Sequence, residues 1–102
     1  RLQERPYAAV ASIVLDDAAT AVAIGANDTL AIGLECGDLL LYVRQLGNTW
    51  TLHDRLDRHH TGVVNDVAFR PAGAWQDDYN EVCYHVLSAG DDGCVRLVSW
   101  SV

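Results

Sequence analysis

Residues 87–98 read LSAGDDGCVRLV, and this stretch decides the fold that the sequence predicts. An acidic pair followed by glycine stands between two runs rich in β-forming residues, which is typical of a tight turn joining antiparallel strands. Upstream, residues 63–69 (VVNDVAF) form a third run of the same kind. The sequence therefore predicts an antiparallel sheet made of residues 63–69, a strand that ends at Ser88, and a strand over residues 95–98.

The first half of the chain has a similar organisation. Residues 20–24, 29–34 and 38–43 are short apolar runs separated by turn residues, which favours strands joined by hairpins. Residues 7–15 (YAAVASIVL) are also apolar, so we expect a strand there, although the alanines leave room for a helix. Residues 50–56 (WTLHDRL) alternate enough to form an outer strand with one polar face.

The two halves align as a repeat. Residues 22–24 (VAI) match residues 67–69 (VAF) at an offset of 45 residues, whereas Gly37 and Gly93 occupy equivalent turns at an offset of 56. A period of roughly 45 residues is ordinary for repeats of four strands. The difference of 11 residues predicts an insertion in the second unit, and residues 72–81 (AGAWQDDYNE) are its polar, acidic candidate.

The composition excludes several classes of protein. A chain of 102 residues with 50% hydrophobic and 21% charged residues is expected to be neither disordered nor membrane-spanning. The first residues lack the apolar core of a signal peptide, and the three cysteines have neither disulfide-framework nor zinc spacing. We therefore expect a reducing compartment, the cytoplasm, with the nucleus as a further location. The net charge of −7 argues against a broad surface for nucleic acid or anionic membrane.

Several features of the second half occur together: the histidine pair at residues 59–60, the V-x-x-V-A-F-x-P pattern over residues 64–71, the S-A-G-D-D-G turn over residues 88–93, and a V-R-L strand. In this combination they resemble one blade of the WD-repeat β-propeller family. The resemblance implies an all-β fold, namely the last two four-stranded antiparallel blades of a WD-repeat propeller, as part of a larger propeller. Residues 1–48 would be a first, degenerate blade and residues 49–102 a second blade that carries the insertion.

The resemblance also assigns a structural role to His60, Ser88 and Asp92. In WD repeats these positions form a buried hydrogen-bond network that continues to a tryptophan, whose position Val98 occupies here. His60 can donate to the Asp92 carboxylate while Ser88 bonds the ring from its other side, and each bond contributes about 1 kcal/mol. The first unit has no such network and is expected to rely on apolar packing, because its equivalents of Ser88, Asp92 and Val98 are Ile32, Cys36 and Tyr42.

Residues 30–42 (LAIGLECGDLLLY) carry a narrower resemblance, to the A-V-G-L-E-C/S-G-x-I-x-L-Y pattern in the last blades of the WD-repeat subunits of Elongator complexes. This resemblance implies a non-catalytic protein–protein interaction scaffold. Its partners would be the catalytic and large scaffold subunits of that complex, and it would support the modification of wobble uridines in tRNA. No cofactor and no membrane are expected, and the net charge of −7 makes direct binding of nucleic acid a minority alternative.

The insertion supplies the candidates for partner contact. Trp75 and Tyr79 stand among acidic residues there, and aromatic side chains of this kind anchor many protein interfaces. The alternative is that both side chains fold back onto their own sheet. No catalytic, cofactor-binding or metal-ligating residue is expected in the chain.

Other functions remain as alternatives. The same fold would serve as a WD-repeat adaptor of another complex, in trafficking, ubiquitin ligation or chromatin. An enzyme built on Ser88, His60 and Asp92 is disfavoured because no nucleophile elbow or oxyanion motif accompanies them. A metal site is disfavoured because the cysteines and histidines lack zinc spacings, and Cys83 with His85 on one strand face is a weak signal. Direct RNA binding would use arginines spread along the chain: Arg55, Arg58, Arg70 and Arg96.

Overall fold

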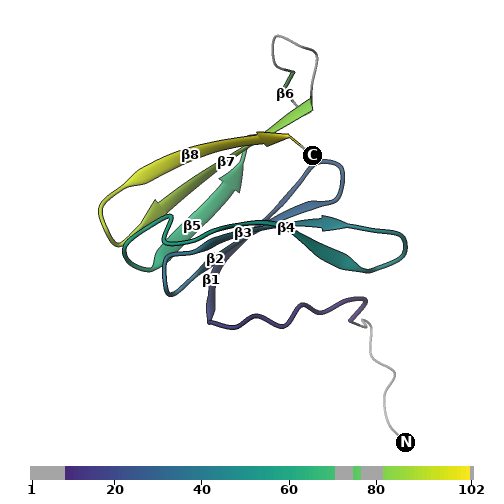
Figure 1. Ribbon diagram of the computed structural model, residues 1–102, viewed down its shortest axis with the longest axis horizontal. Coiled ribbons are helices and arrows are strands. Elements are labelled where there is room, and N and C mark those ends of the chain that lie inside the picture. The colour runs from purple at the N-terminus through teal and green to yellow at the C-terminus, as the bar shows by residue number, and fades with distance from the viewer. Residues whose placement is uncertain (1–8, 71–74, 77–81, 102) are drawn as a thin grey trace, which may run out of the picture.

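The computed structural model of this protein describes residues 9–70, 75–76 and 82–101, and the regular structure in these ranges is all β-strand (Figure 1). The first sheet is antiparallel and its strands follow the chain order: β1 (Ala19–Gly25), β2 (Thr29–Leu34), β3 (Leu39–Arg44) and β4 (Trp50–Leu56). The second sheet is also antiparallel, with its long central strand between two others: β5 (Val64–Phe69), β7 (Val82–Gly90) and β8 (Val95–Ser101). The two-residue β6 (Trp75–Gln76) also pairs with β7.

Two parts of the chain differ from the sequence expectation. The run expected to form a strand over residues 7–15 has no strand in its described part, residues 9–15, and Ile13 and Leu15 instead pack against the first sheet. Their apolar side chains can be buried from an extended segment without backbone pairing, so hydrophobicity alone does not make this segment a strand. The second difference concerns β4, which pairs with β3 and completes the first sheet, although the expected boundary after residue 48 placed it in the second unit.

The predicted repeat is present at the level of strand register. Val22 pairs with Ile32 in the first sheet, and 45 and 56 residues later Val67 pairs with Ser88 in the second. Each sheet has an irregularity in the pairing of its first two strands, between Ala19 and Ala21 and between Val64 and Asp66. The turns match as well, because the N–H of Gly37 donates to Leu34 O and the N–H of Gly93 to Gly90 O, both at 3.1 Å. The two sheets are therefore copies of one unit.

The core lies between the two sheets. Fully or almost fully buried side chains of β2 and β3 meet those of β5 and β7 there: Ala31, Leu39, Leu41, Val64, Val67 and Val86. Burying a valine or leucine side chain contributes about 1.5–3 kcal/mol. A second cluster covers the other face of the first sheet, where Ile13 and Leu15 pack on Ile32, Leu40 and Tyr42. Both faces of the first sheet thus carry packed apolar side chains, while Val22 and Ile24 at its β1 edge stay exposed.

Polar contacts fix how the two sheets meet. The N–H of His60 donates to Gly37 O at 2.9 Å, so the β2–β3 turn lies directly on the connection that leads to β5. Gly37 has a φ of +99°, and a Cβ built there would come within 1.9 Å of His60 O. The hydroxyl of Thr20 donates to Val64 O at 2.5 Å, and the Asn27 amide donates to the Tyr84 hydroxyl at 2.8 Å. These contacts place His60 at the boundary between the two sheets.

Within the described ranges there is no helix long and apolar enough to cross a membrane.

Candidate functional site

The structure brings His60, Ser88 and Asp92 together. His60 lies in the connection before β5, Ser88 lies on β7, and Asp92 lies in the β7–β8 turn. The Nδ1 of His60 is 3.0 Å from Asp92 Oδ1, and its Nε2 is 2.8 Å from the Ser88 hydroxyl. Both ring nitrogens therefore have a partner, although His60 is 0% and Ser88 1% exposed. We call these three residues the buried network.

Asp92 is held in its ionised form by hydrogen bonds. The backbone N–H groups of Thr61 and Cys94 donate to its two carboxylate oxygens, each at 3.0 Å, and His60 adds a third donor. These bonds, led by that from Thr61, lower the pKa of Asp92 from 3.8 to about 2. The ionised Asp92 accepts a hydrogen bond from the Nδ1–H of His60. With that proton on Nδ1, Nε2 accepts a hydrogen bond from the Ser88 hydroxyl.

At the positions equivalent to the buried network, the first sheet has apolar side chains instead of polar ones. The position equivalent to His60 is Leu15. Leu15 packs against the buried cluster that contains Ile32 and Tyr42, the equivalents of Ser88 and Val98. The predicted apolar packing of the first unit is therefore present. Leu15 as the histidine equivalent was not recognised in the sequence. The 45-residue offset between the halves was the signal that could have identified it.

The three network residues have the hydrogen-bond order of a serine hydrolase, Asp to His to Ser. A hydrolase, however, needs its serine oxygen at a surface where a substrate can reach it. Here Ser88 and His60 are closed off between the strands and the connection before β5. The arrangement can hold the β7–β8 turn against that connection, and its burial argues against a reaction at Ser88.

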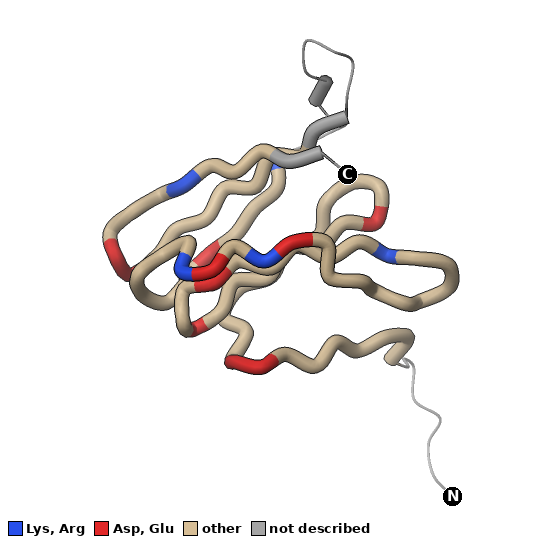
Figure 2. The backbone as a smooth tube through the Cα atoms, in the orientation of Figure 1, with Lys and Arg blue, Asp and Glu red and all other residues tan. Residues whose placement is uncertain are grey.

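A second charged cluster, which the sequence did not reveal, surrounds Asp38 in the turn before β3. Arg55 on β4 donates to Asp38 Oδ2 through Nε and Nη2 at 2.9 and 2.6 Å, and the N–H of Arg58 donates to Oδ1 at 2.7 Å. The bond from Arg58, followed by the Arg55 guanidinium, keeps the pKa of the buried Asp38 below its ordinary value. Figure 2 shows charges of both signs along this connection from β4 to β5. Arg55 is thus engaged with aspartates, which weakens its candidacy as an RNA contact.

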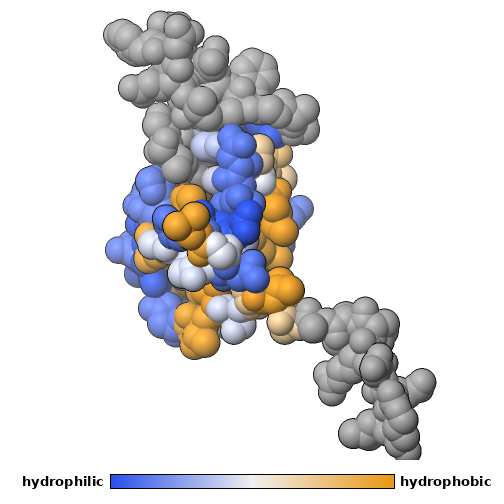
Figure 3. All heavy atoms as spheres, turned by 90° about the vertical axis from the view of Figure 1, so that its right-hand side faces the viewer, coloured by the Kyte–Doolittle hydropathy of each residue, from blue (hydrophilic) through white to orange (hydrophobic). Residues whose placement is uncertain are grey.

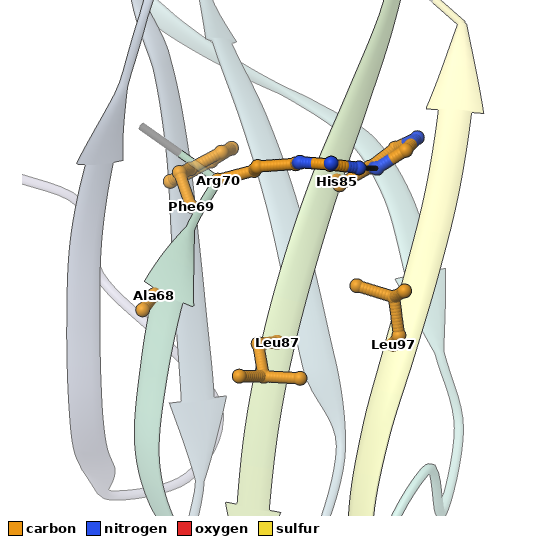
Figure 4. Close-up of a pocket in the computed structure, with 6 residues that line it drawn as sticks. All are labelled: Ala68, Phe69, Arg70, His85, Leu87 and Leu97. Carbon is orange, nitrogen blue, oxygen red and sulfur yellow. Dashed lines mark hydrogen bonds between the residues drawn. The ribbon is translucent and has the colours of Figure 1, made fainter. Parts of the chain in front are cut away.

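The outer face of the second sheet is apolar and open. Its exposed hydrophobic side chains, which we call the open face, come from three adjacent strands: Ala68, Leu87, Val95 and Leu97. Ala68, Leu87 and Leu97 border a groove of about 400 Å³. Arg70 and His85 close this groove at one end, with Arg70 Nη1 3.2 Å from His85 Nδ1 (Figure 4). By contrast, the end of the molecule that carries the β3–β4 hairpin mixes apolar and hydrophilic side chains on the side seen in Figure 3. The open face is therefore the candidate interaction surface.

Other residues singled out in the sequence do not join these sites. Tyr79 lies outside the described residues, and of Trp75 the structure describes only its place in β6. In the described part of the chain, no three His, Cys, Asp or Glu side chains gather in a way that could hold a metal ion. Comparisons with models of protein families, with curated proteins and with solved structures find no match to this chain.

Proposed function

We propose that this chain is a non-catalytic scaffold made of two adjacent blades of a WD-type β-propeller, and that it works by holding other protein subunits together. The observation that carries the proposal is the different exposure of equivalent residues. Leu87, Val95 and Leu97 are 46%, 67% and 64% exposed, whereas their equivalents in the first sheet are all 0% exposed: Ala31, Leu39 and Leu41. In the first sheet these positions are buried in the core between the two sheets, and in the second sheet they are exposed on the outer face.

The opposite end of the pair has the same property. Val22 and Ile24, on the outer face of β1, are 64% and 77% exposed. Their equivalents in β5, Val67 and Phe69, lie in or against the core between the sheets. The outer face of β1 and the open face of the second sheet therefore correspond to the two surfaces that pack together between the sheets. A repeat that continues with a further sheet on each side requires such a pair of surfaces. A β-propeller repeats its four-stranded sheets around a central axis in this way.

The buried network supports the same proposal. A hydrogen-bonded Asp–His–Ser set that is closed to solvent fixes a turn, and a rigid turn at the edge of a sheet is a suitable platform for binding. Such a scaffold acts without a cofactor and without a membrane. Direct binding of nucleic acid is not part of the proposal, because the chain carries a net charge of −7 and Arg55 is engaged by aspartates.

Within this class, we propose the WD-repeat subunit of an Elongator complex. The proposal rests on the likeness of residues 30–42 to the last blades of those subunits. Partners would then be the catalytic and large scaffold subunits, the process served would be wobble-uridine modification of tRNA, and the location would be the cytoplasm and the nucleus. The alternative is an adaptor of another complex, in trafficking, ubiquitin ligation or chromatin.

Affinity purification of the protein from its own cells, followed by mass spectrometry, tests this proposal. Recovery of a catalytic Elongator subunit in stoichiometric amount is the expected result. Stoichiometric recovery of a different complex would replace Elongator by the adaptor alternative. Recovery of the protein without any stoichiometric partner would contradict the scaffold function itself.

A further inference from the structure

The connection from β4 to β5 carries an exposed hydroxyl that the fold does not use. Residues 57–63 form no strand, and the Thr61 side chain is exposed among them. The backbone N–H of Thr61 donates to Asp92 Oδ2 at 3.0 Å, whereas its hydroxyl makes no hydrogen bond within the described ranges. This hydroxyl is therefore available to a reagent that approaches from solvent.

An exposed arginine lies three residues before this hydroxyl. Only the backbone N–H of Arg58 is bound, by Asp38 Oδ1 at 2.7 Å, and its guanidinium has no partner within the described ranges. The other arginine of this region, Arg55, differs because Asp16 and Asp38 bind its guanidinium. A planar guanidinium without a partner suits bidentate binding to a carboxylate of another protein. Arg58 and Thr61 thus offer a cation and a nucleophile at R-x-x-T spacing.

We propose that Thr61 is phosphorylated by a protein kinase that selects an arginine three residues before the acceptor. Carboxylates in the peptide groove of the kinase would bind the Arg58 guanidinium. The Thr61 hydroxyl oxygen attacks the γ-phosphorus of Mg²⁺–ATP, the bond from this phosphorus to the β–γ bridging oxygen breaks, and ADP leaves. The hydroxyl proton passes to the aspartate of the kinase catalytic loop. This modification goes beyond the scaffold function and does not depend on it.

The connection has to open before the transfer. His60, between Arg58 and Thr61, is 0% exposed, and its N–H bonds Gly37 O. A kinase groove binds its substrate in an extended form, so this residue must first leave the β2–β3 turn. A segment without strand pairing opens more readily than a strand. We therefore expect slow phosphorylation of the parent chain and faster phosphorylation of Ser88→Ala, which lacks the bond to His60 Nε2.

The phosphate would keep the connection open. Asp92 accepts the backbone N–H of Thr61 and, with a pKa of about 2, is ionised at neutral pH. A phosphorylated threonine adds a charge of about −1.5 to −2 beside this carboxylate, and the two anions repel each other. The N–H of Cys94 also binds the carboxylate, so Asp92 is held in place while the connection moves away. Phosphorylation thus acts as a switch that releases the connection from the second sheet.

Incubation of the full 102-residue chain with an arginine-directed serine/threonine kinase and Mg²⁺–ATP tests the site. Mass spectrometry of peptides should locate one phosphate on Thr61. Arg58→Ala should lower the rate of modification about tenfold or more, because the kinase loses a charged hydrogen bond. Failure to modify Thr61, or a rate that Arg58→Ala does not change, would overturn the proposal.

The chain contains a matched control at the same spacing. Ser99 is exposed and follows Arg96 by three residues, but it lies in β8 and pairs with His85 of β7. The kinase should modify a synthetic peptide of residues 94–102 and leave Ser99 of the folded chain unmodified. Equal modification of Ser99 and Thr61 in the chain would mean that the kinase acts on unfolded molecules, and would overturn the proposal.

Hydrogen exchange of individual amides tests the switch. In the phosphorylated chain the amides of His60 and Thr61 should exchange about tenfold faster or more, because each loses its acceptor. The amide of Leu41, in the middle of the first sheet, should keep its rate. Slower exchange of His60 and Thr61 would mean that the phosphate pairs with Arg58 and closes the connection. That result, or unchanged exchange, would overturn the switch.

Discussion

Replacing the polar pair of the buried network by apolar residues of similar size tests how the network stabilises the fold. Ser88→Ala removes the hydroxyl that bonds His60 Nε2 at 2.8 Å. His60→Leu removes the ring and introduces the residue that the first sheet has at the equivalent position, Leu15. The double variant removes both partners at once. The three variants and the parent form a double-mutant cycle.

The expected magnitudes follow from burial. A net hydrogen bond contributes about 1 kcal/mol, and a buried polar atom left without a partner costs about 1–3 kcal/mol. Ser88→Ala leaves His60 Nε2 unpaired at 0% exposure, so we expect a loss of about 2 kcal/mol in the free energy of unfolding. His60→Leu also removes the bond to Asp92, so we expect a loss of about 3 kcal/mol.

The double variant should be less destabilised than the sum of the two single variants. With both partners gone, no unpaired polar atom is left between the strands, and we expect a coupling of about 1–2 kcal/mol. Urea unfolding followed by circular dichroism measures all four free energies. Additivity within about 0.5 kcal/mol would refute the reasoning. A Ser88→Ala chain as stable as the parent would refute it as well.

Three further perturbations test other parts of the structure. Gly37→Ala should lower the free energy of unfolding in urea by about 3 kcal/mol or more, because the added Cβ meets His60 O. Gly93→Ala should lower it by only about 1 kcal/mol, the strain of a φ of +78°. Equal losses in the two variants would contradict the packing of the β2–β3 turn. The pKa of Asp92 falls from 3.8 to about 2 on folding, so its contribution to stability is complete above about pH 4 and is lost between about pH 4 and 2. Asp92→Asn should therefore make the melting temperature less dependent on pH over that interval. A pH dependence equal to that of the parent chain would contradict this role. Burial lowers the pKa of His59, whose buried Nε2 has no hydrogen-bond partner among the described residues. The stability of the fold should therefore decline as the pH falls below about 6.5, where the unfolded chain takes up the proton more readily. His59→Phe should raise the melting temperature and remove that decline, and a lower melting temperature of this variant would contradict the expectation.

The sequence was sufficient for the repeat because the repeat depends on local signals, and the family resemblance was sufficient for the buried network. Glycine turns, apolar runs and their spacing predicted that residues 63–69 and the strand ending at Ser88 belong to one antiparallel sheet, and in the structure Val67 pairs with Ser88. The resemblance to WD repeats, carried by the histidine pair and the S-A-G-D-D-G turn, predicted that Asp92 would meet His60. The repeat follows from residues that recur at a fixed offset, whereas His60 and Asp92 are 32 positions apart and were paired by the family pattern.

The parts that could not be predicted depend on contacts between distant segments. The apolar run that contains Ile13 and Leu15 has the composition of a strand, but it packs on a sheet face instead of pairing. The Arg55 pair with Asp38 joins a strand to a turn 17 residues earlier, and no spacing rule indicates it. The sheet that β4 joins likewise depends on which strand has an unpaired edge, here β3. This edge exists only once the chain has folded.

We propose that another sheet covers the open face in the assembled protein. Thiol labelling of a Leu97→Cys variant tests it most directly, in a background where Cys36, Cys83 and Cys94 are serines. Leu46→Cys, at a position 96% exposed in the β3–β4 loop, serves as the control that reacts in every state. We expect the cysteine at position 97 to react rapidly in the isolated chain and slowly in the complex purified from cells. Equal rapid labelling in both would contradict it.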